Sequence, residues 1–247
     1  MAHKGGLLHL KRLPAPAFWP IHRKESVWAP KPNAGAHRSF MCLPLELIVR
    51  NILNLAKTSR EVTKILSQGK VRIDGRVRIE KNYPVGLMDV LEIADANLTF
   101  RVLPVERKGL SLVRVPKDEV KFKLCKILHK TVVPKGRVQL GMHDGRNIVL
   151  APQDGEVTYS TNDSLRVSIP AQRILNHVKF EKGNFALVVA GRNLGKSGTI
   201  VNLQPGTATR PAMVTIQDAS GNKFDTVVDY TFAVGTDKPS IKLGEVS

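Results

Sequence analysis

Residues 59–78 read SREVTKILSQGKVRIDGRVR, a helix pattern followed by a strand pattern. Thr58 and Glu61 have the spacing of a capping box, and Gly69 suits the left-handed residue that often ends a helix. The apolar residues between them recur at helical spacing: Val62, Ile65 and Leu66. The stretch therefore predicts a short amphipathic helix from about residue 60 to residue 69.

From residue 70 the apolar residues alternate, as in a β-hairpin with Asp74-Gly75 at its turn. A two-residue turn would place Ile73 opposite Arg76 and mix apolar with charged side chains. A three-residue turn, Asp74-Gly75-Arg76, avoids this mixing, so parity favours it. The apolar side then holds Val71, Ile73, Val77 and Ile79. The opposite side carries Lys70, Arg72 and Arg78, with Arg76 at the tip.

Two cations of the predicted helix, Arg60 and Lys64, stand four residues apart on a face away from its apolar stripe. Most such pairs are simply solvated. Next to the cations of the hairpin, however, this pair resembles a surface that tracks phosphates. The helix and the hairpin together are therefore a candidate RNA-binding surface.

Composition points to the same class of partner. The chain of 247 residues has 38 Lys and Arg against 21 Asp and Glu, a net charge of +17, which favours a polyanion. An anionic membrane is the rival polyanion, but no apolar run approaches the ~18 residues of a spanning helix. Cys42 and Cys125 are isolated, which excludes a disulfide framework and a Cys-x-x-Cys zinc site. Without the apolar region of a signal peptide at its start, the sequence predicts a soluble intracellular protein.

The segments that precede the helix differ from each other. Residues 1–40 contain five prolines and no sustained periodicity, so they predict an extended basic arm that buries no core of its own. Four histidines lie in this arm without a common zinc spacing, and they suit soft cations near phosphate better than metal ligands: His3, His9, His22 and His37. Residues 42–57, CLPLELIVRNILNLAK, have helical periodicity.

Residues 100–180 have mostly strand patterns. In RVQLGMHDGRNIVL (137–150), alternating apolar residues return around Asp144-Gly145, which predicts a hairpin with an odd-length loop. SLRVSIP (164–170) predicts another strand. His143 and Asp144 invite a catalytic interpretation, but no Ser or Cys nucleophile motif is near, so the pair is better explained as turn chemistry.

AGRNLGKS (190–197) has the spacing of a phosphate-binding loop. Such a loop requires a helix after it, and the following TIVNLQPG is β-branched, short and stopped by Pro205-Gly206. The stretch therefore predicts strand, glycine loop and strand, and no nucleotide binding. Gly191, Gly195 and Gly198 would permit a sharp reversal with positive φ. The longer stretch VVAGRNLGKSGTIVNL resembles the KOW motif, whose exposed polar tips would be Arg192, Asn193 and Lys196.

Several stretches, in one order along the chain, resemble small-subunit ribosomal protein four of the archaeal and eukaryotic type. The resemblance spans essentially the whole chain. It rests on HLKRLPAPAFW, CLPLELIVRN, SREVTKILSQGKVRIDGRVR, YPVGLMDV, VQLGMHDGRNIVL, GRNLGKSGTIVN and DASGNKFDT. The resemblance implies a structural, non-catalytic protein that binds small-subunit ribosomal RNA and neighbouring ribosomal proteins in the cytoplasm, with no membrane, nucleotide, cofactor or metal, and no homo-oligomer.

The implied fold is α+β and mostly β, in four parts. These are a basic extended arm (1–41), a helix-turn RNA-binding domain (42–100), a central β-barrel (101–178) and an SH3-like KOW barrel (179–247). The residues expected to face RNA are Lys11, Arg12, Arg38, Lys57, Arg60, Lys64, Lys70, Arg72, Arg76, Arg78, Arg192, Asn193 and Lys196.

Two other function classes remain as alternatives. An RNA-modifying enzyme of the pseudouridine synthase type uses a similar helix-turn domain to reach RNA, but it needs a catalytic domain with an Asp in a long mixed sheet. A transcription factor built around a KOW motif would account for only the C-terminal residues, about 60 in number.

Overall fold

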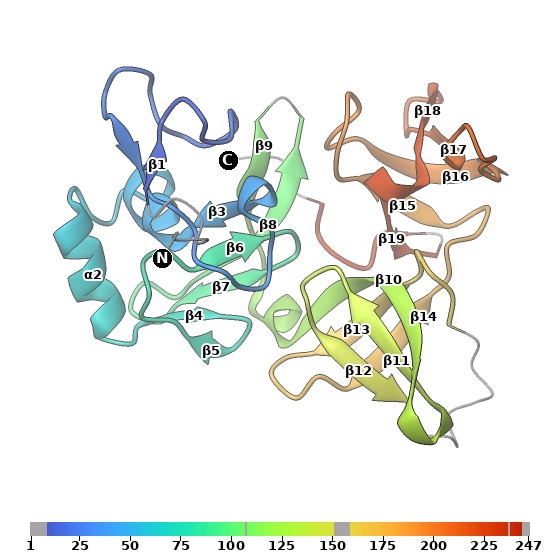
Figure 1. Cartoon of the computed structure of the whole chain (residues 1–247), viewed down its shortest axis with the longest axis horizontal. Helices are drawn as coiled ribbons and strands as arrows, with labels where there is room; N and C mark the ends of the chain where they lie inside the picture. The colour runs from blue at the N-terminus through green and yellow to red at the C-terminus, as the bar shows by residue number, and fades with distance from the viewer. Residues whose placement is uncertain (1–8, 107, 151–158, 237, 244–247) are drawn as a thin grey trace, which may run out of the picture.

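The computed structural model of the chain describes residues 9–106, 108–150, 159–236 and 238–243. Over these residues β-strands dominate and helices are few and short (Figure 1). Most of the strands in the described part form three antiparallel five-stranded sheets. The expected α+β, mostly β class is therefore confirmed. No helix among the described residues is long and apolar enough to cross a membrane.

The first sheet follows the helical segment of the chain. In spatial order its strands are β5 (Arg76–Val77), β4 (Val71–Ile73), β7 (Val90–Ile93), β8 (Leu98–Val105) and β9 (Gly109–Arg114). A separate pair joins β3 (Cys42–Pro44) to β6 (Pro84–Gly86). The expected domain boundary between residues 100 and 101 falls inside β8, because β8 and β9 extend this sheet.

Two helical segments pack on the first sheet. The first is a short α1 (Leu45–Leu47) that continues as a π-helical turn, η2 (Ile48–Ile52), so the periodicity of residues 42–57 produces less α-helix than its length suggests. The second is α2 (Ser59–Ser67), where the predicted capping box is present and Gly69 has a φ of +71°. The helix predicted from the opening stretch is confirmed to within two residues.

The β4–β5 hairpin does not have the predicted three-residue turn. Its register pairs Ile73 with Arg76 and Arg72 with Val77, which leaves only Asp74 and Gly75 in the turn. Both turn residues have positive φ, 50° and 73°, the geometry that best matches the twist of the flanking strands. Turn geometry therefore outweighs apolar parity, and Val77 and Ile79 are left 47% and 63% exposed.

The central sheet contains the hairpin predicted from residues 137–150. In spatial order its strands are β12 (Asn147–Leu150), β11 (Arg137–Met142), β10 (Phe122–Val133), β13 (Ser164–Ser168) and β14 (Ile174–Val178). Val138 pairs with Leu150 and Leu140 with Ile148, so the predicted hairpin is confirmed. Short 3-10 turns precede β10 at η3 (Lys117–Lys121) and follow it at η4 (Pro134–Gly136).

The C-terminal sheet contains the glycine loop. In spatial order its strands are β18 (Lys223–Val227), β17 (Met213–Gln217), β16 (Ser197–Gln204), β15 (Phe185–Val188) and β19 (Thr231–Gly235), with η6 (Val228–Tyr230) before the last. A strand, β16, starts at Ser197, where a phosphate-binding loop would require a helix. The predicted strand, loop and strand are confirmed.

The arm has no core of its own, but its apolar residues pack into the core of the neighbouring sheet. Its secondary structure is slight: β1 (Leu10–Lys11) pairs with β2 (Trp28–Ala29), and η1 (Ser39–Met41) follows. Trp19, however, is only 2% exposed, and its Nε1 donates to the carbonyl of Cys42 at 2.9 Å. Ala15 and Ile21 are buried in the same cluster as Leu66 of α2.

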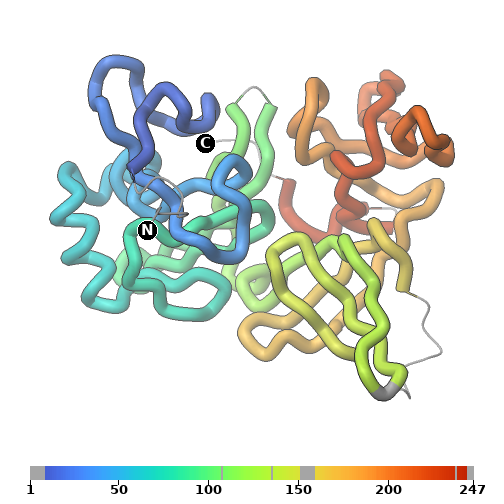
Figure 2. Tube along the Cα trace, in the orientation of Figure 1, coloured from blue at the N-terminus to red at the C-terminus, as the bar shows by residue number. Residues whose placement is uncertain are grey.

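A second core cluster joins three parts of the chain. It contains Leu103 of β8, Leu124 of β10, Phe232 of β19 and Ile241 near the C-terminus, among others. The β8–β9 hairpin (green) lies between the arm (blue) and the C-terminal sheet (orange to red), as Figure 2 shows. The described parts of the chain therefore pack against one another and share a hydrophobic core, rather than forming independent domains.

Candidate nucleic-acid interface

The cations of α2 and of the residues just before it are free of the core. Val62 and Leu66 are buried against the first sheet, and Lys57, Arg60 and Lys64 are exposed. The backbone N–H of Lys57 donates to the Glu61 carboxylate at 2.8 Å, which fixes the chain at the start of the helix. The structure therefore leaves Arg60 and Lys64 on the solvent side of α2, and Lys57 exposed just before it.

The cations of the hairpin lie on two faces of the sheet. Arg76 lies opposite Ile73 and so on the face that carries α2, whereas Arg72 points to the other face with Val77. Both arginines are exposed. Arg60, Lys64 and Arg76 therefore lie on the α2 side of the sheet, and Arg72 does not share it.

The other two predicted cations of this region make contacts within the chain. The ammonium of Lys70 pairs with Asp95 at 2.5 Å, and the guanidinium of Arg78 lies 4.4 Å from the centre of the Tyr83 ring. Both side chains are half-buried or paired, so each would give up a contact to reach a phosphate.

The predicted cations of the arm differ in the same way. Lys11 and Arg38 are exposed, and the Lys11 ammonium lies 6.0 Å from the centre of the Trp28 ring. Arg12 is half-buried, and its Nε donates to the carbonyl of Ile21 at 2.9 Å. This contact closes the loop between β1 and β2.

The glycine loop is less exposed than predicted. Arg192 is exposed, but Asn193 donates to the carbonyl of Asp225 at 3.3 Å, and the Lys196 ammonium lies 5.3 Å from the centre of the Phe224 ring. Gly195 has a φ of +86°, and a Cβ there would lie 2.4 Å from the backbone nitrogen of Glu106. The expectation of three exposed tips is wrong for Asn193 and Lys196, which are only partly exposed because their side chains contact β18. Gly195, between them, packs on the β8–β9 hairpin.

Gly191 has the positive φ that was predicted, at +83°. Gly198 does not have a positive φ. A glycine is needed there because a Cβ would lie 2.1 Å from the carbonyl oxygen of Gln217 on β17.

A buried charge network, which sequence reasoning missed, joins the first and central sheets. Lys123 of β10 is 0% exposed, and its ammonium lies 3.0 Å from Asp74 Oδ2, 2.9 Å from Asp144 Oδ2, and in contact with Asp89. Arg146 bridges two of these carboxylates, at 2.5 Å from Asp74 and 3.0 Å from Asp144. The only signal in the sequence is a lysine between Phe122 and Leu124 in an apolar run.

The arm also contributes to this network. His37 Nε2 lies 3.0 Å from Asp89 Oδ2. The expectation that the histidines of the arm serve as soft cations near phosphate is therefore wrong for His37, whose side chain is buried against a carboxylate. His3 lies outside the described residues.

The pKa values in the network follow from burial and from close charges. Burial alone raises the pKa of Asp144, but the charges of Lys123 and of neighbouring cations lower it to about 2. The pKa of Asp89 is lowered for the same reason, and the carboxylates hold the pKa of Lys123 well above its usual value despite burial. Burial and the charge of Asp89 raise the pKa of Asp74. The network is therefore held by charges that compensate one another.

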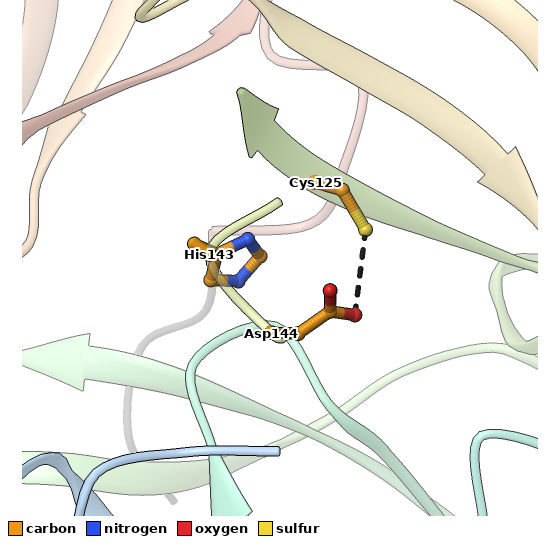
Figure 3. Close-up of side chains that lie close together, drawn as sticks. All are labelled: Cys125, His143 and Asp144. Carbon is orange, nitrogen blue, oxygen red and sulfur yellow. Dashed lines mark hydrogen bonds between the residues drawn. The ribbon is translucent and has the colours of Figure 1, made fainter. Parts of the chain in front are cut away.

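Cys125 and His143 lie close to Asp144 of this network (Figure 3). Burial raises the pKa of the Cys125 thiol, which donates to Asp144 Oδ2 at 3.7 Å. His143 Nδ1 accepts the backbone N–H of Lys126 at 3.2 Å, and Nε2 lies 3.2 Å from the carbonyl of Leu87, which suits a neutral ring. Burial and the charge of Lys123 lower the pKa of His143 to about 4.

These contacts use the atoms that a metal would need. Asp144 also accepts from the backbone N–H of Arg146 at 3.2 Å, as the turn chemistry predicted from the sequence requires. We therefore interpret the three residues as packing and turn contacts.

Comparison with known proteins covers the whole chain. Sequence profiles match ribosomal family S4e over residues 96–174, the RS4NT domain over residues 4–39 and the S4 domain over residues 44–91. Small ribosomal subunit protein eS4 of Staphylothermus marinus is 47% identical over 99% of this chain and 99% of its own length. The chain belongs to ribosomal family S4e.

Other members of the family support the same alignment. Small ribosomal subunit protein eS4 of Methanocaldococcus jannaschii is 46% identical over 98% of this chain and 100% of its own length. The crystal structure of 30S ribosomal protein S4e from Thermoplasma acidophilum superimposes with a TM-score of 0.65 at 32% identity. It covers 78% of this chain and 94% of that one. The S4e fold is thus found in an independent structure.

The matched S4 domain coincides with the helix and hairpin from which the sequence argument began. Residues 44–91 contain α2, β4 and β5. Seven of the residues expected to face RNA lie in this range: Lys57, Arg60, Lys64, Lys70, Arg72, Arg76 and Arg78.

Proposed function

We propose that this protein is a structural component of the small ribosomal subunit in the cytoplasm and that it binds the ribosomal RNA of that subunit. The observation that carries the proposal is the similarity, over 99% of the chain, to proteins named small ribosomal subunit protein eS4. The S4 domain and the net charge of +17 supply a matching RNA-binding surface. A ribosomal protein family does not include a pseudouridine synthase, so the enzyme alternative is wrong.

Within this function we propose four parts: the arm, the S4 domain, the central sheet and a C-terminal SH3-like barrel of the KOW type. Support for the last part is the strand order β18-β17-β16-β15-β19 around the loop at residues 190–197. Neighbouring small-subunit proteins are the proposed protein partners, with no homo-oligomer and no nucleotide. The boundary of the S4 part is better placed after β9 than at residue 100, since β8 and β9 belong to its sheet.

The proposed phosphate contacts centre on the exposed cations of the S4 domain. Arg60, Lys64 and Arg76 share the α2 side of the sheet, where each can reach a phosphate without breaking a contact inside the chain. We propose that Arg72, on the other face of the sheet, contacts the phosphate of a different RNA segment. Each cation placed on a phosphate releases condensed counterions, which makes the affinity depend on salt.

Alanine substitution of Arg60, Lys64, Arg72 and Arg76, one at a time, tests this assignment. Binding to small-subunit ribosomal RNA is measured over a range of salt concentrations by filter retention. Each variant should flatten the slope of log K against log salt by about 0.7–0.9 for the lost contact. Folding should be retained, because these side chains lie outside the core.

The matched control is Lys223→Ala, which removes an exposed cation from β18, outside the proposed surface. It should leave the slope unchanged. If all four S4-domain variants keep the parental slope, the S4 face is only solvated. If the parent protein does not bind the RNA, the ribosomal function itself is wrong.

A further inference from the structure

A pocket lies where the arm folds over the S4 domain. Its volume is about 320 Å³, at the lower end of the range of small-molecule sites. One wall is the β1–β2 pair of the arm, with His9 and Trp28. The other wall comes from the segment after α1 and from the loop before β6, with Arg50 and Lys81. In Figure 2 the arm (blue) lies beside the segment that carries these helical turns (lighter blue).

The aromatic wall is exposed but held in place. Trp28 is 56% exposed, although tryptophan has one of the largest apolar surfaces of any side chain and is usually well buried. Its backbone pairs with Lys11, and its carbonyl accepts from Ser26 Oγ at 3.0 Å. The His9 ring lies 5.4 Å from the indole, centre to centre. The Lys11 ammonium lies 6.0 Å from the centre of the indole. Because these neighbours already restrict the ring, a planar ligand that stacks on it loses less affinity to side-chain ordering than it would on an isolated side chain.

The opposite wall carries excess positive charge. Glu46 is buried, and its carboxylate is shared by Arg50 at 3.0 Å and Lys81 at 3.8 Å. The Lys81 ammonium also donates to Ser59 Oγ at 2.9 Å, at the first residue of α2. One acid therefore faces two cations on this wall. An anion in the pocket would compensate the remaining charge.

A platform for a planar ring and a cationic wall across one pocket fit the two halves of a nucleotide. We propose that this pocket takes a single unpaired nucleotide of RNA, with its base stacked on Trp28 and its phosphate on Arg50 and Lys81. Stacking on an aromatic side chain accepts any base, and recognition of RNA by proteins concentrates on such unpaired nucleotides. The proposal rests on the proposed function, because it assigns a particular contact within RNA binding.

The pocket is tested with a uridine octamer and the full-length protein. The variant Trp19→Phe leaves Trp28 as the only tryptophan, since the sequence has two. Addition of the octamer at low salt should quench the emission of Trp28 and protect it from acrylamide. Trp28→Ala should weaken octamer binding about 5- to 150-fold without changing the salt slope, because an indole releases no counterions.

Two further variants separate stacking from loss of fold. Trp28→Phe keeps an aromatic face and should recover most of the affinity. Phe40→Ala is the matched control, because Phe40 is an exposed aromatic of the arm that does not line the pocket. It should bind as the parent does.

A separate variant tests the phosphate contact. Lys81→Gln should lower the salt slope by about 0.7, the value for one contact with a single strand.

The possible outcomes distinguish failure of the pocket proposal from failure of the proposed function. If ribosomal RNA binds but Trp28 stays unquenched and Trp28→Ala binds the octamer like the parent, the pocket proposal is wrong and the function stands. If an octamer of glutamate quenches Trp28 and the RNA octamer does not, the pocket serves an acidic protein segment, which also overturns the proposal. If neither ribosomal RNA nor the octamer binds, both proposals are wrong.

Discussion

Lys123 is the residue on which the junction between the S4 domain and the central sheet depends. It stands on β10 and faces three carboxylates, from the β4–β5 turn, from the residue before β7 and from the β11–β12 loop. Removal of one partner from a buried ion network leaves uncompensated charge in a poorly solvated site, which costs more than the network contributes as a whole. The network therefore specifies how the two sheets dock more than it adds to overall stability.

We expect Lys123→Met to lower the free energy of unfolding by about 3–5 kcal/mol. Methionine keeps much of the side-chain volume, so the loss reports the missing charge rather than a cavity. Urea unfolding followed by circular dichroism measures the change. The control is Lys121→Met, at an exposed lysine two residues away, which should stay within about 0.5 kcal/mol of the parent. Equal stability of the two variants would show that the buried ammonium is dispensable.

At the residue scale, the sequence predicted the two faces of a regular helix but not a buried charge. Arg60 and Lys64 were predicted to leave the core because helical spacing separates them from Val62 and Leu66, and they do. The burial of Lys123 was not predicted, because its three partners come from loops that are 21 to 49 residues away in sequence. No local pattern brings those loops together.

At the scale of elements, the sequence predicted an element correctly where its local patterns all favour the same structure. The capping box of Thr58 and Glu61 and the stripe behind it defined α2 almost to the residue. The β4–β5 turn failed because two rules conflict there: parity favours three residues, and the positive φ of Asp74 and Gly75 favours two. The structure adopts the two-residue turn, whose twist matches the flanking strands, and leaves Val77 and Ile79 exposed.

The loop at residues 190–197 offers a test of close packing between elements. Gly195 and Gly221 have nearly the same φ, +86° and +83°, but a Cβ at Gly221 meets nothing within 4 Å. Gly221→Ala therefore costs only the left-handed backbone, about 1–2 kcal/mol. Gly195→Ala should cost more, because its Cβ would overlap the backbone of Val105 and Glu106.

The two alanine variants are compared by their free energies of unfolding in urea. Gly195→Ala should also raise amide hydrogen exchange at the tip of the β8–β9 hairpin, which Gly221→Ala should not do. Equal losses in the two variants would mean that the loop yields without moving the hairpin.

For the molecule as a whole, shared cores explain why the expected division into separate parts is incomplete. One cluster combines Met88 of the S4 region, Phe122 of the central sheet and Val234 of the C-terminal sheet. A sequence read segment by segment assigns apolar residues to the nearest element, so it predicts that each part buries its own core. Contacts between segments far apart in sequence leave no local sequence pattern. For this reason neither the domain boundaries nor the packing of the arm could be predicted from the sequence.

The arm shows this limit most clearly, and its two tryptophans provide the test. Trp19 is 2% exposed in the cluster shared with the S4 domain, and Trp28 is 56% exposed. Trp19→Ala removes a buried indole and its hydrogen bond to the Cys42 carbonyl, so we expect a loss of about 3–5 kcal/mol. Trp28→Ala should lose less than about 1 kcal/mol, because most of its ring already faces water.

Limited proteolysis reports the same difference as a change in accessibility. With the anchor at Trp19 removed, trypsin should cut the arm at Arg12, Arg23 and Lys24 well before it cuts the rest of the chain, because a released segment reaches the protease without global unfolding. In the parent and in Trp28→Ala, the tightly packed neighbours of Trp19 should slow cleavage at Arg12, whose Nε is bound to the Ile21 carbonyl. The emission of tryptophan in the free protein gives an independent measure. Trp19 alone, in Trp28→Phe, should emit at short wavelength and resist acrylamide, and solvent-like emission from that variant would show that the arm is not anchored.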